Sequence, residues 1–239
     1  MNASMVEALR AELAALGIPL YGFAEVGGLF SGPWAEWPRA ISLALPFSEQ
    51  DLAGVHLGPT PAYYAAYREL NARLNAAAQA VETWINAQGY RAKAFPATVT
   101  QAELDSALGP DFTAPVQHKT VATRAGLGWI GKNALLVTLQ YGPRVRLASV
   151  LTDLPLPTAR PITRSFCGTC NLCVDACPAD ALSGISWHAG VPTKELVDVQ
   201  ACQRTADWLA YGRAKANETI CGICIAVCPL KGRQRRKHL

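Results

Sequence analysis

Apolar residues follow two different patterns in the first two thirds of the chain. Residues 62–88 carry apolar side chains at every third or fourth position, with charged and amide side chains between them, which predicts a long helix ended by Gly89. Strands interleaved with helices indicate a layered α/β (α+β) domain. Short apolar runs predict the strands at 19–26, 40–47, 90–95, 134–139 and 144–152, and further helices are expected up to Gly17 and at 115–124.

The composition is that of a globular protein and gives no sign of a membrane segment. Half of the 239 residues are apolar and 17% are charged. No uncharged apolar run approaches the ~20 residues that span a bilayer. Glu7, Arg10 and Glu12 interrupt what would be the apolar part of a signal peptide. We therefore expect a cytoplasmic protein without membrane contact, in which cysteines bind metals or react and seldom form disulfides.

The cysteines divide the chain into two parts. All eight lie between Cys167 and Cys228, and the first 166 residues contain none. The proline-rich stretch from Leu151 to Pro161 has the composition of a linker. The expected domains are therefore residues 1–160, an α/β domain, and residues 161–239, a metal-binding module.

The spacing of the cysteines is typical of a ferredoxin-like module with two 4Fe–4S clusters. The first motif is C-x2-C-x2-C-x3-C-P, whose fourth cysteine serves the other cluster in two-cluster ferredoxins. The second motif, C-x2-C-x3-C-P, is one cysteine short and needs Cys202 from upstream. Exchange of the two Cys-Pro cysteines predicts one cluster on Cys167, Cys170, Cys173 and Cys228, and another on Cys202, Cys221, Cys224 and Cys177.

Other uses of the cysteines and of the positive charge fit less well. Zinc favours separated C-x2-C pairs with a long spacer, and this spacing is too dense for that arrangement. The formal charge of +4 falls to about zero once two clusters, each about −2 with its thiolates, are counted. Five Lys and Arg residues among the last nine stay a possible RNA contact, although such a tail is usually solvated.

A glycine-rich segment precedes the last two predicted strands. Gly126, Gly128 and Gly131 match G-x-G-x-x-G, but a dinucleotide site needs a strand before the glycines and a helix after them, and here the order is reversed. A helix stop followed by a tight turn is the simpler interpretation. The alternative is that the small residues around Trp129 let a large planar ligand approach the backbone, with Lys132 and Asn133 binding its polar edge.

These motifs together resemble the epoxyqueuosine reductase family. The segments that carry the resemblance are AGLGWIGKN, the Tyr-Gly turn, LTDLPL and CGTCNLCVDACP, between about Ala114 and Pro229. Members of that family are cobalamin-dependent relatives of reductive dehalogenases, with a nitroreductase-like corrinoid-binding domain beside two 4Fe–4S clusters. The resemblance implies that residues 126–133 help to hold a base-off corrinoid, and that the clusters reduce its cobalt.

Two departures from the family pattern change what is expected. The sequence ends ten residues after Pro229, without the C-terminal helical repeats that bind tRNA in longer relatives, so tRNA is not expected as a partner. The family's proton-donating Asp is replaced by Phe112. Asp111, His118 and Tyr64 are the candidates to supply the proton instead.

The sequence thus predicts a cobalamin-dependent iron–sulfur reductase that resembles epoxyqueuosine reductase and acts on a small molecule or modified nucleoside of unknown identity. A low-potential ferredoxin or flavodoxin is the expected electron donor. The alternative is a ferredoxin-type electron-transfer protein that carries two clusters and no corrinoid.

Overall fold

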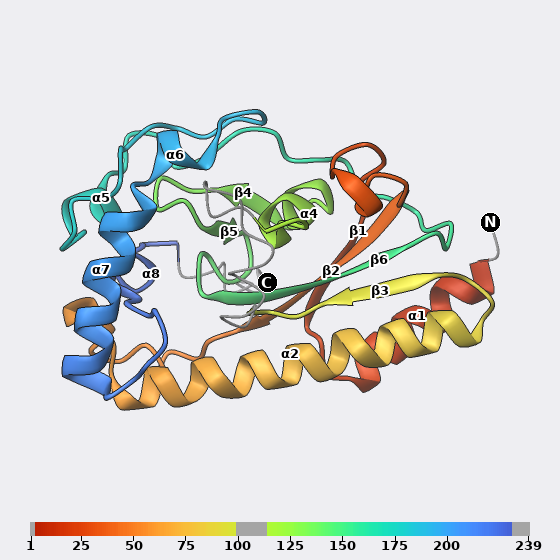
Figure 1. Ribbon diagram of the computed structural model, residues 1–239, viewed down its shortest axis with the longest axis horizontal. Helices are drawn as coiled ribbons and strands as arrows, with labels where there is room; N and C mark the ends of the chain where they lie inside the picture. The colour runs from red at the N-terminus through yellow and green to blue at the C-terminus, as the bar shows by residue number, and fades with distance from the viewer. Residues whose placement is uncertain (1–2, 99–113, 231–239) are drawn as a thin grey trace, which may run out of the picture. The chain divides into compact units, whose positions relative to one another are not determined.

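The computed structural model describes residues 3–98 and 114–230 (Figure 1). These residues divide into two compact units, each assembled from separate parts of the chain. The sheet unit comprises Met1–Leu45, Leu70–Leu127 and Arg146–Ile162. The cysteine unit comprises Pro46–Glu69, Gly128–Val145 and Thr163–Leu239.

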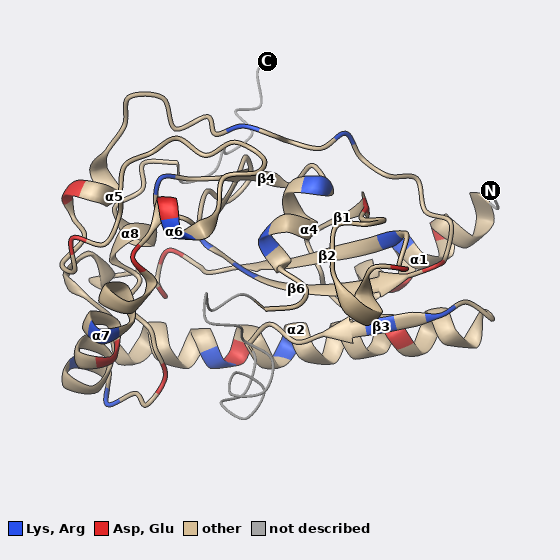
Figure 2. Ribbon diagram, turned by 45° about the horizontal axis from the view of Figure 1, so that its top comes forward, with Lys and Arg blue, Asp and Glu red and all other residues tan. Residues whose placement is uncertain are grey.

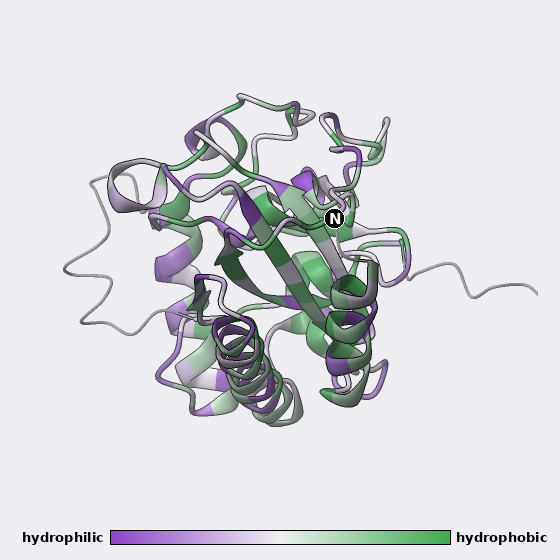
Figure 3. Cartoon of the chain, turned by 90° about the vertical axis from the view of Figure 1, so that its right-hand side faces the viewer, coloured by the Kyte–Doolittle hydropathy of each residue, from purple (hydrophilic) through white to green (hydrophobic). Residues whose placement is uncertain are grey.

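A four-stranded sheet forms the centre of the sheet unit, with strand order β1-β2-β6-β3. β1 runs antiparallel to β2, and β3 runs antiparallel to β6. Six consecutive residues of β2 are buried, so both faces of this strand are covered. The strands are largely hydrophobic in Figure 3. Their bounds are Leu20–Glu25 for β1, Arg39–Pro46 for β2, Ala92–Phe95 for β3 and Val145–Thr152 for β6.

Helices cover the two faces of this sheet. Successive residues of a strand point to opposite faces. On β1, Phe23 lies under the guanidinium of Arg10 from helix α1 (Ala3–Ala15), at 5.5 Å from the ring centroid. The neighbouring Gly22 faces the end of helix α4 (His118–Arg124), where an added Cβ would lie 2.7 Å from the Ala125 carbonyl oxygen. The sheet therefore separates α1 from α4.

The long helix α2 (Pro61–Ala87) protects the free edge of the sheet at β3. Asn86, Glu82 and Asn75 accept hydrogen bonds from backbone amides of the β3 segment, at 2.9, 2.6 and 2.8 Å. An edge strand whose amides are occupied in this way is a poor template for pairing with another chain. Basic and acidic residues alternate along α2 (Figure 2), which favours a solvated outer face.

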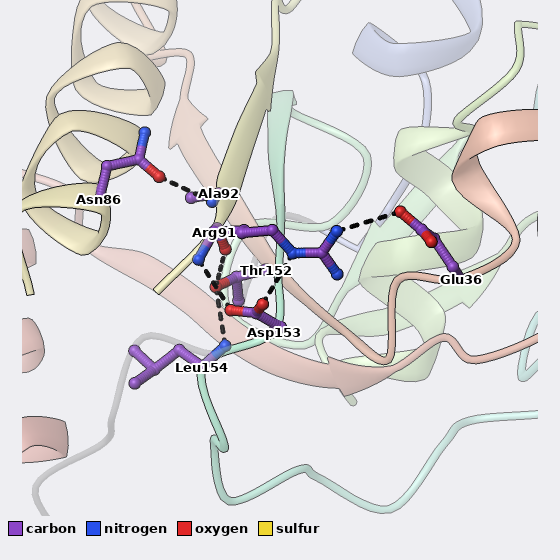
Figure 4. A network of polar contacts seen from close by, with 7 residues as sticks. All are labelled: Glu36, Asn86, Arg91, Ala92, Thr152, Asp153 and Leu154. Carbon is purple, nitrogen blue, oxygen red and sulfur yellow. Dashed lines mark hydrogen bonds and ion pairs between the residues drawn. The ribbon is translucent and has the colours of Figure 1, made fainter. Parts of the chain in front are cut away.

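Arg91 fastens the beginning of β3 to the end of β6 (Figure 4). Its backbone amide and Nε donate to the two carboxylate oxygens of Asp153, at 2.8 and 2.9 Å. Its Nη1 donates to Glu36 at 3.2 Å, and its backbone carbonyl accepts from the Thr152 hydroxyl at 2.8 Å. Both carboxylates raise the pKa of Arg91.

The cysteine unit contains a two-stranded hairpin and several short helices. β4 (Gly128–Ile130) pairs with β5 (Leu136–Thr138), and Gly128 lies opposite Thr138. The other elements are α5 (Leu172–Asp175), α6 (Thr193–Leu196), α7 (Val199–Leu209), a π-helical turn (Ala210–Ala214), α8 (Ile223–Ala226) and a 3-10 turn (Val55–Leu57).

The structure divides the chain differently from the single boundary expected at residue 160. Residues 46–69 and 128–145 belong with the cysteines because they pack tightly against the second cysteine motif and the residues after it. A Cβ on Gly222 would lie 2.6 Å from Val55, and a Cβ on Gly142 would overlap the Leu230 carbonyl oxygen.

The predicted strands and the long helix are present, whereas the helix expected from 115 begins at His118. Residues 128–130, expected in a loop, form β4. Within the described ranges, no helix has both the length and the apolar character needed to cross a bilayer.

Candidate metal centre

Four cysteines from the two ends of the cysteine-rich segment lie together around one cavity. The cavity has a volume of about 120 Å³, and Cys167, Cys170, Cys173 and Cys228 line it. The thiol of Cys173 is under the electrostatic influence of the other three, and Cys228 is under that of Cys167 and Cys170. We call these residues the first set. They are the four that the spacing assigns to one cluster.

The remaining cysteines form a second set. Cys202 lies near Cys177 and Cys221. Cys224 interacts with all three of them and also with Cys173 of the first set. The structure thus brings together Cys177, Cys202, Cys221 and Cys224, and it places the two sets next to each other.

Burial raises the pKa of five of the thiols, and neighbouring thiols raise it further. These five are Cys173, Cys202, Cys221, Cys224 and Cys228. For Cys173 the result is a pKa of about 11, and for the almost fully buried Cys224 the shift is larger. Without a cation, such thiols stay protonated at neutral pH. Thiolates are the form that binds metal, so a metal cluster supplies the positive charge that this arrangement lacks.

The two sets suit clusters better than a single ion. In residues 3–98 and 114–230, no three His, Cys, Asp or Glu side chains converge on a point where one ion would touch all of them. Thiolates that each bind a different iron of a 4Fe–4S cluster surround a larger volume. The four thiols around the cavity of the first set have that arrangement.

Local backbone geometry holds the cysteines in place. The amide of Cys170 donates to the Cys167 carbonyl, which closes the first turn. Asp198 caps α7 by accepting from the Ala201 amide at 2.9 Å, and this helix carries Cys202. Gly222 has a φ of +84°, which an L side chain rarely adopts, and it lets the turn from Cys221 to Cys224 approach Val55.

Lys132 and Asn133 line the cavity of the first set. Lys132 is only 7% exposed, and its Nζ donates to Asn171 Oδ1 at 2.7 Å, within the first cysteine motif. Asn133 Oδ1 accepts from the Leu135 amide at 3.2 Å. The polar pair expected at the edge of a planar ligand therefore faces the thiols. The remaining lining residues are Val137, Phe166, Pro229 and Leu230.

Each glycine of the glycine-rich segment has a structural reason within the chain. Gly126 follows α4 with a φ of +69°, the left-handed conformation that commonly ends a helix. A Cβ on Gly128 would overlap the Val137 carbonyl across the hairpin, and one on Gly131 would lie 2.6 Å from Asn133 Oδ1. The simpler interpretation, a helix stop and a tight turn, describes this segment, and corrinoid contact stays a prediction.

Trp129 leaves one polar group unused. The side chain is 3% exposed, and its ring packs edge-on against Phe166 at 5.2 Å between centroids. Its Nε1–H has no acceptor among the described residues. A buried indole N–H normally finds a partner, so this donor fits a bound group.

The three proton-donor candidates differ in their surroundings. Asp111 lies outside the described residues. His118 Nε2 donates to the Pro96 carbonyl and its Nδ1 accepts from Ser149, both at 2.9 Å, and burial lowers the pKa of His118 to about 4. Tyr64 donates to Glu218, whose carboxylate raises the pKa of Tyr64. At neutral pH His118 is therefore uncharged and carries no imidazolium proton to donate, and Tyr64 is a weaker acid than an ordinary tyrosine.

Sequence reasoning did not identify Arg144 or Phe166 as part of this centre. Arg144 is 7% exposed and acts electrostatically on Cys228, while Phe166 lines the cavity directly before Cys167. The proximity of Phe166 to the first cysteine was a usable signal. Nothing in the sequence around Arg144 indicates that its turn packs against the last cysteine motif.

Comparison with known proteins confirms the double-cluster module. Residues 166–231 match the family model described as a 4Fe-4S double cluster binding domain. The epoxyqueuosine reductase of Gloeobacter violaceus is 39% identical over 127 residues, which cover 52% of this chain and 39% of that protein. The tetrachloroethene reductive dehalogenase of Dehalobacter restrictus is 38% identical over 130 residues, covering 49% of this chain and 23% of the relative.

Solved structures show a similar fold over nearly the whole chain. A catabolic reductive dehalogenase superposes with a TM-score of 0.69 at 20% identity, over 94% of this chain and 31% of its own. An epoxyqueuosine reductase bound to a modified tRNA stem loop gives 0.59 at 20% identity, over 95% and 65%. The resemblance found in the sequence is thereby confirmed, although the matched region spans about two fifths of the curated reductases.

Proposed function

We propose that this chain is an iron–sulfur reductase that takes electrons from a low-potential donor, such as a ferredoxin or flavodoxin, and delivers them through two 4Fe–4S clusters to a base-off corrinoid. The observation that carries the proposal is the convergence of eight thiols in two sets of four. The names of the relatives, an epoxyqueuosine reductase and a reductive dehalogenase, support reductive chemistry.

The residues of the first set fit a cluster in both shape and charge. Four thiols surround the cavity, and the buried ammonium group of Lys132 lies beside it. An isolated buried cation is costly unless an anion lies nearby. A cluster with four thiolates carries a negative charge, so the cluster and the ammonium group of Lys132 stabilise each other.

The corrinoid part of the proposal rests on the resemblance and on Trp129. We propose a nitroreductase-like corrinoid-binding fold in which Trp129 and its neighbours contact the cofactor, and the unused indole N–H supplies a hydrogen bond. When bound, a corrinoid supplies a strongly reducing cobalt centre. The chain's own part is to orient the ligand and to exclude water from it.

Trp129→Phe is a sharper test of corrinoid contact than a change at a glycine. Substitution of Gly128 breaks the β4–β5 hairpin whether or not a ligand binds there. The phenylalanine keeps an aromatic ring against Phe166 and removes the N–H, together with part of the ring volume of the indole. We expect weaker cobalamin binding with unchanged iron content. Unchanged cobalamin affinity would remove Trp129 from the site.

The substrate and its proton donor are separate proposals. Asp111 is the proposed acid, and Asp111→Asn should abolish turnover while leaving cobalamin bound and reducible. His118 and Tyr64 stay alternatives, but the pKa shifts of both disfavour proton donation at neutral pH. A halogenated organic compound and an epoxyqueuosine-modified tRNA stem loop are the two substrates to assay first, since the relatives' names point to them. Our prediction is that the tRNA is not converted.

A dicluster electron carrier is the second candidate. The observation in its favour is that all three glycines of the segment 126–131 are explained by contacts within the chain. Such a carrier would hold the same two clusters and bind no corrinoid.

One reconstitution experiment separates these functions. Anaerobic protein is supplied with iron, sulfide and cobalamin, and its metal content and visible spectrum are recorded. About eight irons with stoichiometric cobalt support the reductase. About eight irons without cobalt support the carrier. Four irons, or stoichiometric zinc, would contradict both.

A further inference from the structure

Lys132 is a buried cation directed at the first set of cysteines. It lines their cavity, and its Nζ is held by Asn171, which lies between Cys170 and Cys173 in the sequence. No carboxylate in residues 3–98 or 114–230 forms an ion pair with it. Its positive charge is therefore balanced by whatever anion the cavity holds.

Arg144 places a second cation beside the same set. It is 7% exposed, and its Nε has no hydrogen-bond partner within the described chain. It follows the turn at Gly142, which packs so closely on Leu230 that a side chain would overlap the carbonyl oxygen there. This packing brings the arginine close to Cys228, whose thiol it influences electrostatically.

The surroundings of the second set are different. A carboxylate, that of Asp198, influences Cys202 of this set. Cys202 is also the one exposed cysteine among the eight. The two sets therefore share the same ligand atoms but have surroundings of opposite charge.

The geometry points to Lys132 and Arg144 as residues that raise the reduction potential of the first cluster above that of the second, so that electrons settle on the first. A nearby cation stabilises the more negative, reduced form of a cluster. The step is a transfer of one electron, in which the second cluster is oxidised as the first is reduced, and no bond or proton moves. This inference rests on the proposed function, because it requires both clusters.

Reductive titration of single-cluster variants tests the inference. Cys224→Ala is expected to leave only the first cluster, and Cys170→Ala only the second. Lys132→Gln is added to each background, since glutamine keeps an amide donor for Asn171 and removes the charge. With dithionite as reductant and EPR as readout, we expect the ratio of reduced to oxidised first cluster at a fixed potential to fall about tenfold. This change corresponds to a reduction potential that is lower by ~59 mV. The second cluster should not change.

Matched variants separate charge from packing. Lys132→Arg keeps the charge and should restore the potential of the first cluster. Arg144→Gln should lower it, as Lys132→Gln does. Lys194→Met removes an exposed cation on α6 of the same unit and should leave both potentials unchanged.

The outcomes for the two proposals are distinguishable. Iron content and the titration of the unaltered protein test the presence of the clusters. Two clusters with no shift in Lys132→Gln and Arg144→Gln, or equal shifts in both clusters, would overturn the inference and leave the proposed function standing. Absence of clusters from the unaltered protein would overturn both.

Discussion

The sheet unit and the cysteine unit differ in how much apolar surface they remove from water. Eleven of the twelve largest fully buried side chains of the described chain belong to the sheet unit, and Val55 is the exception. Conversely, the described chain has nine exposed large apolar side chains. Eight of them belong to the cysteine unit, and Leu29 is the exception. Burial of apolar surface is the main favourable term in folding, so the cysteine unit needs another source of stability.

Metal binding supplies that source. Five cysteine thiols of this unit have raised pKa values because they are buried near other thiols, and the free-energy cost of that arrangement is recovered only when iron replaces their protons. The sheet unit needs no such contribution, because its core and the polar network around Arg91 are complete within the chain. The comparison predicts that the two units respond differently to loss of metal.

Removal of iron should have the largest effect. Chelation of both clusters is expected to lower amide-exchange protection in residues 163–230 by at least about 100-fold, while the strands β1, β2, β3 and β6 keep theirs. Hydrogen exchange measured by mass spectrometry resolves the two regions. Equal loss of protection in both would show that the units do not differ in this way.

Paired cysteine substitutions should change iron content in a pattern set by the crossed ligand sets. Cys228→Ala alone should reduce the content from about eight irons to about four. Adding Cys170→Ala should cause no further loss, because both residues serve the first cluster. Adding Cys224→Ala instead should remove nearly all iron. If Cys228 and Cys224 served one cluster, the two double variants would give the reverse result.

Substitution of two glycines in the cysteine unit distinguishes the cost of backbone strain from the cost of close packing. Gly222 and Gly190 both have positive φ, but only Gly222 has side chains within reach of a Cβ, those of Val55 and Tyr63. Gly190→Ala should cost about 1 kcal/mol from strain alone, and Gly222→Ala about 3 kcal/mol because the neighbours must also move. Denaturant unfolding of the cluster-loaded protein measures both. Equal costs would mean that residues 46–69 can move away from the second cysteine motif.

Sequence patterns predicted the helices and strands of the sheet unit well, because these elements depend on the order of neighbouring residues. A period of 3.6 residues predicted the helix at 61–87, and short apolar runs predicted the strands at 20–25, 39–46 and 145–152. The grouping of the thiols was in part a local matter too, because C-x2-C spacing places two cysteines within one turn of backbone. The exchange of Cys177 and Cys228 between the sets links residues far apart in sequence, and it was predicted from the pattern of two-cluster ferredoxins.

Long-range packing could not be predicted in the same way. Arg144 reaches Cys228 only because Gly142 allows the turn to lie on Leu230, a contact across more than eighty residues. The glycines 126, 128 and 131 suggested a ligand site, since their pattern is compatible with both a tight turn and a close approach of a ligand. The direction in which Lys132 points, toward the thiols, depends on the fold of the hairpin.

The smallest expected effect lies in the sheet unit and concerns His118. Burial lowers its pKa from 6.5 to about 4, so the unfolded chain binds the proton more readily than the folded one. The stability that neutral His118 contributes is present above pH 6.5 and is lost as the pH falls toward 4. Between pH 7.5 and 5.5 the loss should be about 1 kcal/mol. His118→Gln, which cannot titrate, should lack this part of the pH dependence in denaturant unfolding, and because other groups titrate equally in both proteins, the difference between them isolates His118. An identical pH dependence in the two proteins would mean that His118 is accessible to protons in the folded state, and it would again be a candidate acid.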